Sequence, residues 1–250
     1  MSSIGTGYDL AASTFSPDGR IFQIEYAQKA VDNSATVIAL AGKKGVVTAV
    51  DRIIPSKLLV DNANPRINYA NDYIGFAGAG IYPDCISLLD YVQGEALKYL
   101  KENNEITSIE KLATKLAEYV HIFTLGISRP FGCSFFLTGY TEDEGSRIYM
   151  IEPSGFSFRC KAWAVGKHAQ AAKTEIEKLK LAELSQEELV REAVRILMAV
   201  RDESKQYEQT VELSWVGANT NCKHQLVNKS VATAAEEWAK AQLEDADMED

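Results

Sequence analysis

The apolar positions near the N-terminus predict a helix that follows a tight turn. From Ile21 onward, apolar side chains recur at helical spacing and form one stripe, which comprises Ile21, Ile24, Ala27 and Val31. Residues 16–19 read Ser-Pro-Asp-Gly and favour a turn, because proline fixes φ while glycine accepts a positive φ. We therefore expect an N-terminal helix within residues 17–33, preceded by an ordered segment.

Two apolar runs come next and predict a β-hairpin. Residues 35–41 and 46–50 are apolar almost throughout, and the Gly-Lys-Lys-Gly stretch between them is typical of a turn. Strands that are apolar on both sides are buried on both faces, so other layers should cover this sheet on each side. Short apolar runs between turn residues predict further strands at 66–69, 73–77, 132–158, 163–166 and 211–216.

Helical patterns lie in pairs between these blocks of strands. Their starts carry recognisable signals: Pro83 opens one helix, a Thr107-x-x-Glu110 capping box opens the next, and a Ser185-x-x-Glu188 box opens another. The helices are predicted at 83–100, from 107 to 123, 168–180, 185–205 and 231–243. The order of blocks, without β-α-β alternation, predicts an α+β fold with sheet layers inside and helices outside. We expect a single domain over residues 1–243.

Composition and charge argue against several classes of protein. The chain has 250 residues and a formal net charge of −9, which disfavours a nucleic-acid-binding surface. No apolar run reaches the ~18 residues of a membrane span, and no secretory signal precedes the first helix. The cysteines are widely spaced, so we expect a reduced intracellular protein without a disulfide framework or a zinc site. The acidic residues 244–250 predict a disordered tail.

Common catalytic motifs are absent from the sequence. It contains neither the G-x-S-x-G elbow of serine hydrolases nor the G-x-x-x-x-G-K-[ST] loop of nucleotide-binding proteins. The glycine-rich residues 75–80 lack dinucleotide-binding spacing and predict a close turn from a strand to a helix. The histidines are isolated from potential metal ligands, and we expect no metal site.

The segment from Gly7 to Val31 resembles the N-terminal signature of proteasome alpha subunits. The matching residues are Tyr8, Asp9, Thr14, Phe15, Ser16, Pro17, Gly19, Arg20, Gln23, Glu25, Tyr26 and Ala27. The resemblance extends over nearly the whole chain, from residue 2 to about 243. It implies a four-layer α-β-β-α sandwich of the N-terminal-nucleophile hydrolase type with an extra N-terminal helix, and it implies no cofactor.

The resemblance also predicts that the chain does not catalyse hydrolysis. Catalytic relatives place a nucleophile at the start of the first hairpin strand, and counting back from Asp51 puts this position at Ala35, which has no nucleophilic atom. Thr36 follows one residue later and should point to the opposite face of the strand. Two alternatives stay open from the sequence: an active threonine hydrolase that exposes Thr36 or Ser34, and a free-standing binding protein with the same sandwich.

The resemblance assigns a gate to the N-terminal region. It implies that Tyr8, Asp9, Pro17 and Tyr26 form a cluster that holds the N-terminal turn in an open-pore geometry, with residues 1–16 as the gate tail. The residue chemistry also fits an ordinary helix cap with aromatic cover. Many alpha subunits have arginine at the position of Leu10, so one charged contact to a neighbouring subunit is missing here.

The resemblance further implies a place in an assembly. The chain would be a structural and gating subunit of the alpha ring of the 20S core, and it would control substrate entry for ubiquitin-dependent degradation in cytoplasm and nucleus. Its partners would be other alpha subunits, beta subunits and regulatory caps, such as 19S or other activators. Arg66 lies near the position of the lysine that receives an activator's terminal carboxylate; a plain surface arginine is the alternative.

Overall fold

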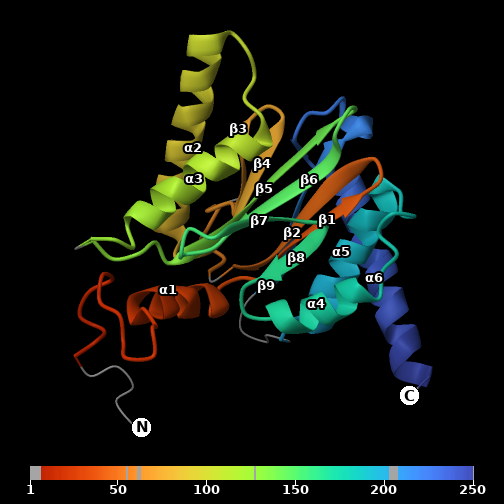
Figure 1. Cartoon of the computed structure of the whole chain (residues 1–250). Coiled ribbons are helices and arrows are strands. Elements are labelled where there is room, and N and C mark those ends of the chain that lie inside the picture. Colours follow the sequence, from red (N-terminus) through yellow and green to blue (C-terminus); the bar gives the residue numbers. More distant parts are fainter. Residues whose placement is uncertain (1–6, 55, 61–62, 127, 203–207, 250) are drawn as a thin grey trace.

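The strands of this chain form two antiparallel sheets that stack face to face (Figure 1). The computed structural model describes residues 7–54, 56–60, 63–126, 128–202 and 208–249. The first sheet has the order β10-β9-β2-β1-β8, and the second has the order β3-β4-β5-β6-β7. This arrangement places the first hairpin in the middle of one sheet, where both of its strands are paired on both sides.

The first sheet is built around the predicted hairpin. Its strands are β1 (Val37–Gly42), β2 (Gly45–Ile54), β8 (Ala162–Val165), β9 (Glu208–Gly217) and β10 (Gln225–Leu226). The hairpin register runs from Val37 opposite Val50 to Gly42 opposite Gly45. The prediction that β1 and β2 are buried on both faces is confirmed, because their residues up to Asp51 are buried at nearly every position. The short strand β10 was not predicted.

The second sheet contains the glycine-rich segment. Its strands are β3 (Ile67–Asn71), β4 (Ile74–Gly80), β5 (Cys133–Thr141), β6 (Gly145–Ile151) and β7 (Ser157–Cys160). The strand predicted at residues 73–77 is confirmed, but it continues to Gly80 as the buried strand β4, so the turn predicted at residues 75–80 is wrong. Glycine is needed there for close packing: a Cβ at Gly75 would lie 2.4 Å from Cδ2 of His224. Burial lowers the pKa of that histidine to about 4.

Helices cover the outer face of each sheet, which confirms the predicted α+β fold and its four-layer α-β-β-α order. On one side, α2 (Tyr82–Asn103) and α3 (Ile109–Ile122) enclose an apolar core with the second sheet. On the other side, α4 (Ala169–Glu177), α5 (Gln186–Val200) and α6 (Lys229–Glu249) pack on the first sheet. A third core, which includes Phe136, lies between the two sheets. Figure 1 shows these layers from the side.

Several helix ends differ from the predicted ones. The Ser185 capping box is confirmed, since the Ser185 hydroxyl accepts from the Glu188 amide and the Glu188 carboxylate accepts from the Ser185 amide. At α3, however, the cap is Ser108 instead of Thr107, because the Ser108 side chain accepts from the Lys111 amide. Helix α5 ends at Val200, earlier than predicted, because Arg201 adopts an extended conformation.

The last helix is longer than the sequence pattern indicated. Helix α6 continues past Leu243 to Glu249, so the acidic end of the chain carries helical backbone where we predicted disorder. Glutamate and alanine are good helix formers, which lets the helix continue beyond its apolar stripe. Within the part of the chain that the structure describes, no helix is both long and apolar enough to cross a membrane.

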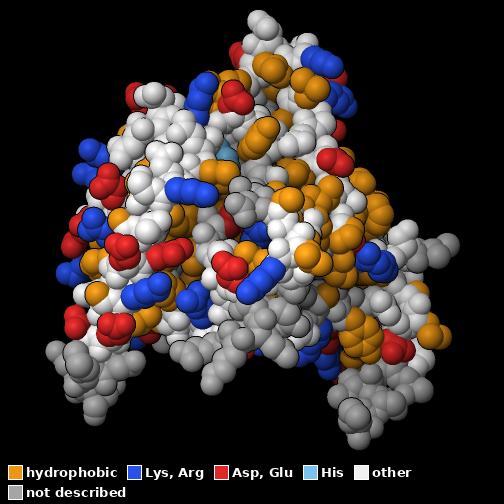
Figure 2. Space-filling model, turned by 180° about the vertical axis from the view of Figure 1, so that it is seen from behind, with side chains coloured by type: hydrophobic (Ala, Val, Ile, Leu, Met, Phe, Trp, Pro, Cys, Tyr) orange, Lys and Arg blue, Asp and Glu red, His pale blue; other side chains and the backbone are white. Residues whose placement is uncertain are grey.

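The surface seen from behind carries mixed charge. Figure 2 shows Asp and Glu side chains interspersed with Lys and Arg side chains, and apolar side chains gathered along one side of this face. Some large apolar side chains are almost fully exposed, with Leu58 at 94% and Leu10 at 85%. Exposed apolar side chains that lie together commonly mark surfaces that contact a partner.

Candidate functional site

A closed turn leads into the N-terminal helix. Ser16 is buried and its backbone N–H donates to the Arg20 carbonyl over 2.9 Å, while the Arg20 N–H donates to the Ser16 hydroxyl over 3.0 Å. The Gly19 N–H donates to the Ser16 carbonyl over 2.9 Å, and Gly19 has a φ of +75°. Because residues 16–20 form this turn, helix α1 spans Phe22–Asp32 and begins later than the predicted limit at 17.

Helix α1 holds the preceding segment through Asp9. The Tyr26 hydroxyl donates to Oδ2 of Asp9 over 3.3 Å, and the Gln23 side-chain amide donates to the Asp9 carbonyl oxygen. Desolvation and then the neighbouring Asp9 carboxylate raise the pKa of Tyr26, so its hydroxyl stays protonated and able to donate. The Phe22 and Tyr26 rings stack with their centroids 6.2 Å apart. This segment is therefore fixed to one face of α1.

The structure brings together part of the predicted cluster. Asp9 and Tyr26 are in contact, Pro17 lies in the turn at the base of α1, and Tyr8 is exposed to 42% beside them. Gln23 was part of the sequence signature, but its role as a clamp on the Asp9 carbonyl could not be read from the sequence. Residues 1–6 of the predicted gate tail lie outside the described residues.

A cavity of about 940 Å³ opens next to the C-terminal end of α1. It is lined by residues from the α1–β1 connection, from β2 and from the segments around residues 66 and 167. Those that matter for its chemistry are Ser34, Ala35, Thr36, Asp51, Arg66, Tyr82, Lys167, His168 and Asp202. The cavity therefore lies where the resemblance places the active site of catalytic relatives.

The residues at the expected nucleophile position cannot attack a carbonyl group. Ala35, directly before β1, has no nucleophilic atom. Thr36 is only 2% exposed. Its hydroxyl accepts a hydrogen bond from the His168 backbone N–H over 3.2 Å. The Ser34 hydroxyl donates to the Val31 carbonyl over 2.7 Å at the end of α1. Each hydroxyl that the alternative hydrolase would need has a structural contact instead.

Asp51 lines this cavity together with the charged residues Lys167 and Asp202. Asp51 is 6% exposed, and its Oδ1 has no hydrogen-bond partner among the described residues. Burial raises the pKa of its carboxyl group. The Lys167 ammonium is paired with Asp202 over 2.6 Å rather than with Asp51. Asp51 therefore has no nucleophile to assist at position 35, which is alanine.

Arg66 lies in the wall of the same cavity. Its Nη1 donates to the Gly80 carbonyl over 2.8 Å, and its guanidinium carbon lies 5.4 Å from the centre of the Tyr82 ring. Its backbone N–H donates to the Glu212 carboxylate over 3.0 Å. Arg66 is thus half-buried, and these contacts hold its side chain in place. The structure also shows no group of side chains suited to a metal ion among the residues it describes.

Fold and site together define a class of protein: an α-β-β-α sandwich of the N-terminal-nucleophile hydrolase type that lacks the nucleophile and carries an added N-terminal helix. Comparison with known families agrees. Residues 31–216 match the family model described as proteasome subunit, and residues 8–30 match the model of the N-terminal signature of A-type proteasome subunits. The chain therefore belongs to the proteasome subunit family and is of the alpha type.

Curated relatives match along almost their whole length. The chain is 46% identical to the alpha type-3 proteasome subunit of Oryza sativa subsp. japonica over 250 residues, which cover 100% of both chains. It is 46% identical to the alpha type-3 proteasome subunit of Drosophila melanogaster, over 93% of this chain and 92% of the relative. It is 39% identical to the probable alpha type-7 proteasome subunit of Saccharomyces cerevisiae, over 97% of this chain and 86% of the relative.

Family membership decides between the alternatives that the sequence left open. Alpha-type subunits are non-catalytic components of the threonine protease complex, so the prediction of a non-catalytic subunit is confirmed. Ala35 at the nucleophile position gives the physical reason. The chain assembles with other proteasome subunits, which excludes a free-standing binding protein.

Proposed function

We propose that this chain is a structural and gating subunit of the alpha ring of the 20S core, and that it controls substrate entry for ubiquitin-dependent protein degradation in cytoplasm and nucleus. The observation that carries the proposal is the clamp on Asp9, in which Tyr26 and Gln23 of α1 bind the segment that leads to the N-terminal tail. A tail anchored to a rigid helix can occupy a defined position at a pore. Restricting entry would confine hydrolysis to unfolded chains.

The exposed apolar residues beside α1 supply a surface for ring neighbours. Leu10 is exposed to 85% and Phe15 to 65%, and both lie in the segment that α1 fixes. Exposed apolar side chains on an ordered segment fit an interface that is completed in the assembly. Leu10, which replaces the arginine of many relatives, would contribute an apolar contact there instead of an ion pair. Beta subunits would pack on another face of the ring.

Arg66 fits the role of receiving the terminal carboxylate of a regulatory cap, such as 19S or another activator. Its position in the cavity wall is set by the bond to Gly80 and by the Tyr82 ring. A guanidinium has five N–H donors, so a carboxylate can bind to those that do not contact Gly80. Because the side chain is held in place before binding, less conformational entropy is lost when a cap docks.

Removing the Tyr26 hydroxyl should impair cap-driven opening. In a core particle that carries Tyr26→Phe, we expect the ratio of cap-stimulated to basal peptide hydrolysis to fall by about two- to fivefold, because one hydrogen bond that holds the open geometry is lost. Fluorogenic peptide hydrolysis with and without the cap measures this ratio. Native electrophoresis verifies that the variant chain is incorporated.

A matched variant separates gating from general damage. Tyr69→Phe removes the hydroxyl of another exposed tyrosine, on β3 and away from the Asp9 clamp. We expect it to leave the ratio unchanged. If Tyr26→Phe behaves like Tyr69→Phe in particles with a normal subunit content, the Asp9 clamp does not control the gate.

A further inference from the structure

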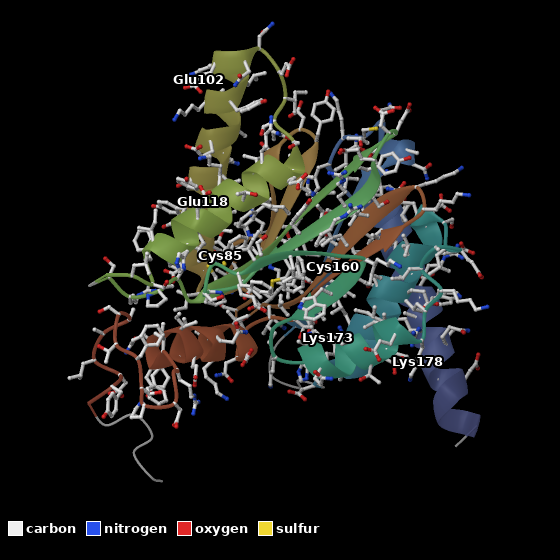
Figure 3. All side chains as sticks on the ribbon, in the orientation of Figure 1. Cys85, Glu102, Glu118, Cys160, Lys173 and Lys178 are labelled. Atoms are coloured by element: carbon white, nitrogen blue, oxygen red, sulfur yellow. The ribbon has the colours of Figure 1, made fainter. Side chains whose placement is uncertain are left out.

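Two of the cysteines lie next to each other although they are far apart in the sequence. Cys85 is in the first turn of α2, and Cys133 is the first residue of β5. Both thiols are buried, and they lie close enough that each shifts the pKa of the other. Figure 3 shows Cys85 at the end of α2 that meets the sheet, with Cys160 on a different strand, β7.

The corner where β4, α2 and β5 meet brings the two side chains together. Gly80, the last residue of β4, pairs with Cys133, and the Ile81 N–H donates to the Gly132 carbonyl over 2.9 Å. The Asp84 carboxylate then accepts from the Gly132 N–H over 2.8 Å, which ties the first turn of α2 to the start of β5. The backbone next to both cysteines is therefore fixed by the hydrogen bonds that Ile81 and Asp84 make with Gly132.

Glycines leave room for the sulfur atoms. A Cβ at Gly78 would lie 2.9 Å from Sγ of Cys85, and a Cβ at Gly80 would lie 3.0 Å from Cβ of Cys133. A side chain at either position would intrude on the pair. The two glycines therefore keep the space beside both cysteine side chains free of other side chains.

The two thiols differ in acidity. The neighbouring Cys133 thiol lowers the pKa of Cys85 despite burial, and the charge of Arg66 acts in the same direction. The neighbouring Cys85 thiol, together with burial, raises the pKa of Cys133. The start of a helix also favours a thiolate at Cys85. Cys85 is thus suited to attack an oxidant, and Cys133 to resolve the product.

The corner lies beside the cavity but does not open into it. Arg66 lines the cavity and also acts on the Cys85 thiol, whereas neither cysteine is part of the cavity lining. Cys85 is 4% exposed and Cys133 is fully buried. A small, uncharged peroxide fits this access better than a bulky thiol reagent does.

We propose that Cys85 and Cys133 are a redox-sensitive pair that hydrogen peroxide converts into a disulfide. In the first step, the Cys85 thiolate attacks one peroxide oxygen; an S–O bond forms, the O–O bond breaks and hydroxide leaves, so sulfur is oxidised to sulfenic acid while peroxide is reduced. In the second step, Cys133 attacks the Cys85 sulfur. The S–S bond forms, the S–O bond breaks, and the hydroxyl leaves as water with the Cys133 proton.

The other cysteines serve as internal controls. Burial raises the pKa of Cys160 to about 12, so this thiol is poorly reactive. Cys222 is half-buried and lies next to the second sheet at its other end, near Tyr73. A reversible disulfide agrees with a reducing compartment, where disulfides are usually transient and redox-sensing.

The test uses the full-length chain in its assembled particle. Particles are treated with increasing hydrogen peroxide, free thiols are alkylated under denaturing conditions, and the peptides are analysed by mass spectrometry. We expect a cross-linked peptide that contains Cys85 and Cys133, reversed by dithiothreitol, while Cys160 and Cys222 remain alkylated. If Cys85 and Cys133 stay as free as in untreated particles at concentrations that oxidise Cys222, the proposal is overturned.

Variants test the order of the two steps. Cys133→Ser should form no cross-link and should accumulate a sulfenic acid at Cys85, which dimedone labels, whereas Cys160→Ser should form the cross-link as the unmodified chain does. The unmodified particle alone decides whether the disulfide forms, so the test stands even if Cys133→Ser fails to fold. Dimedone labelling of Cys160 or Cys222 instead of Cys85 would contradict the assignment of the attacking thiol.

Discussion

Replacing Asp84 with alanine is expected to lower the free energy of unfolding by about 3 kcal/mol. Asp84 is 6% exposed and accepts from both terminal nitrogens of Arg129, over 2.6 and 2.8 Å, and from the Gly132 N–H over 2.8 Å. Alanine would leave the buried Gly132 N–H without its acceptor. It would also release Arg129 and remove an acidic residue from the first turn of α2. Denaturation by urea, followed by circular dichroism, measures the change.

A control variant on the same helix isolates the effect of the buried contacts. Asp90 is an exposed residue of α2, and Asp90→Ala should change the free energy of unfolding by less than about 0.5 kcal/mol. Equal effects of Asp84→Ala and Asp90→Ala would show that the corner does not depend on the buried carboxylate.

The same contact should have a signature in the pH dependence of stability. Burial by itself pushes the pKa of Asp84 upward, but the hydrogen bonds from Arg129 and Gly132 outweigh it, so the pKa of the folded chain lies below the ordinary value. The contribution of Asp84 is therefore present above the unfolded pKa of ~3.9 and is lost as the pH falls through the folded pKa. An Asp84→Asn variant should lose less stability than the unmodified chain over this acidic range.

Replacing Gly166 with alanine should destabilise the chain by about 3 kcal/mol, because strain and a clash combine. Gly166 has a φ of +99°, a conformation that residues with a Cβ rarely adopt. A Cβ at this position would also lie 2.2 Å from the Ala35 carbonyl oxygen. The affected backbone is the start of the first hairpin, so the variant tests how tightly the former nucleophile position is packed.

A second glycine provides the opposite expectation. Gly94 lies on the exposed face of α2, and a Cβ there would meet nothing within 4 Å. Gly94→Ala should stabilise the chain by up to about 1 kcal/mol, because alanine is the better helix former. Thermal denaturation of the two variants would contradict the account if Gly166→Ala were as stable as Gly94→Ala.

The layers of the fold could be predicted from the apolar pattern because each element carries a local signal. The doubly apolar runs at β1 and β2 required cover on both faces, and the Ser185 capping box marked a helix start correctly. The errors arose where tertiary contacts decide. The glycines of β4 look like a turn in sequence, yet they allow close packing under α2 and His224. The end of α6 carries no apolar stripe, so its helical backbone could not be anticipated.

The candidate site was only partly predictable for a similar reason. The missing nucleophile is visible in the sequence, since Ala35 cannot attack whatever its surroundings. The contact between Asp9 and Tyr26 depends on the turn at residues 16–20, which folds the preceding segment back along α1. The approach of Cys85 to Cys133 depends on the register of β4 with β5 and is not encoded by sequence spacing. Arg66 likewise acquires its partners only when β4 and α2 are in place.

The central claim is that this chain enters the proteasome uncleaved, as a non-catalytic alpha-type subunit. The most direct test is native mass spectrometry of the assembled particle, followed by denaturing mass measurement and N-terminal sequencing of this subunit. We predict a large multi-subunit particle in which the chain retains α1 and the residues before Ala35. A chain that begins at Ser34 or Thr36 would show self-processing and would contradict the account.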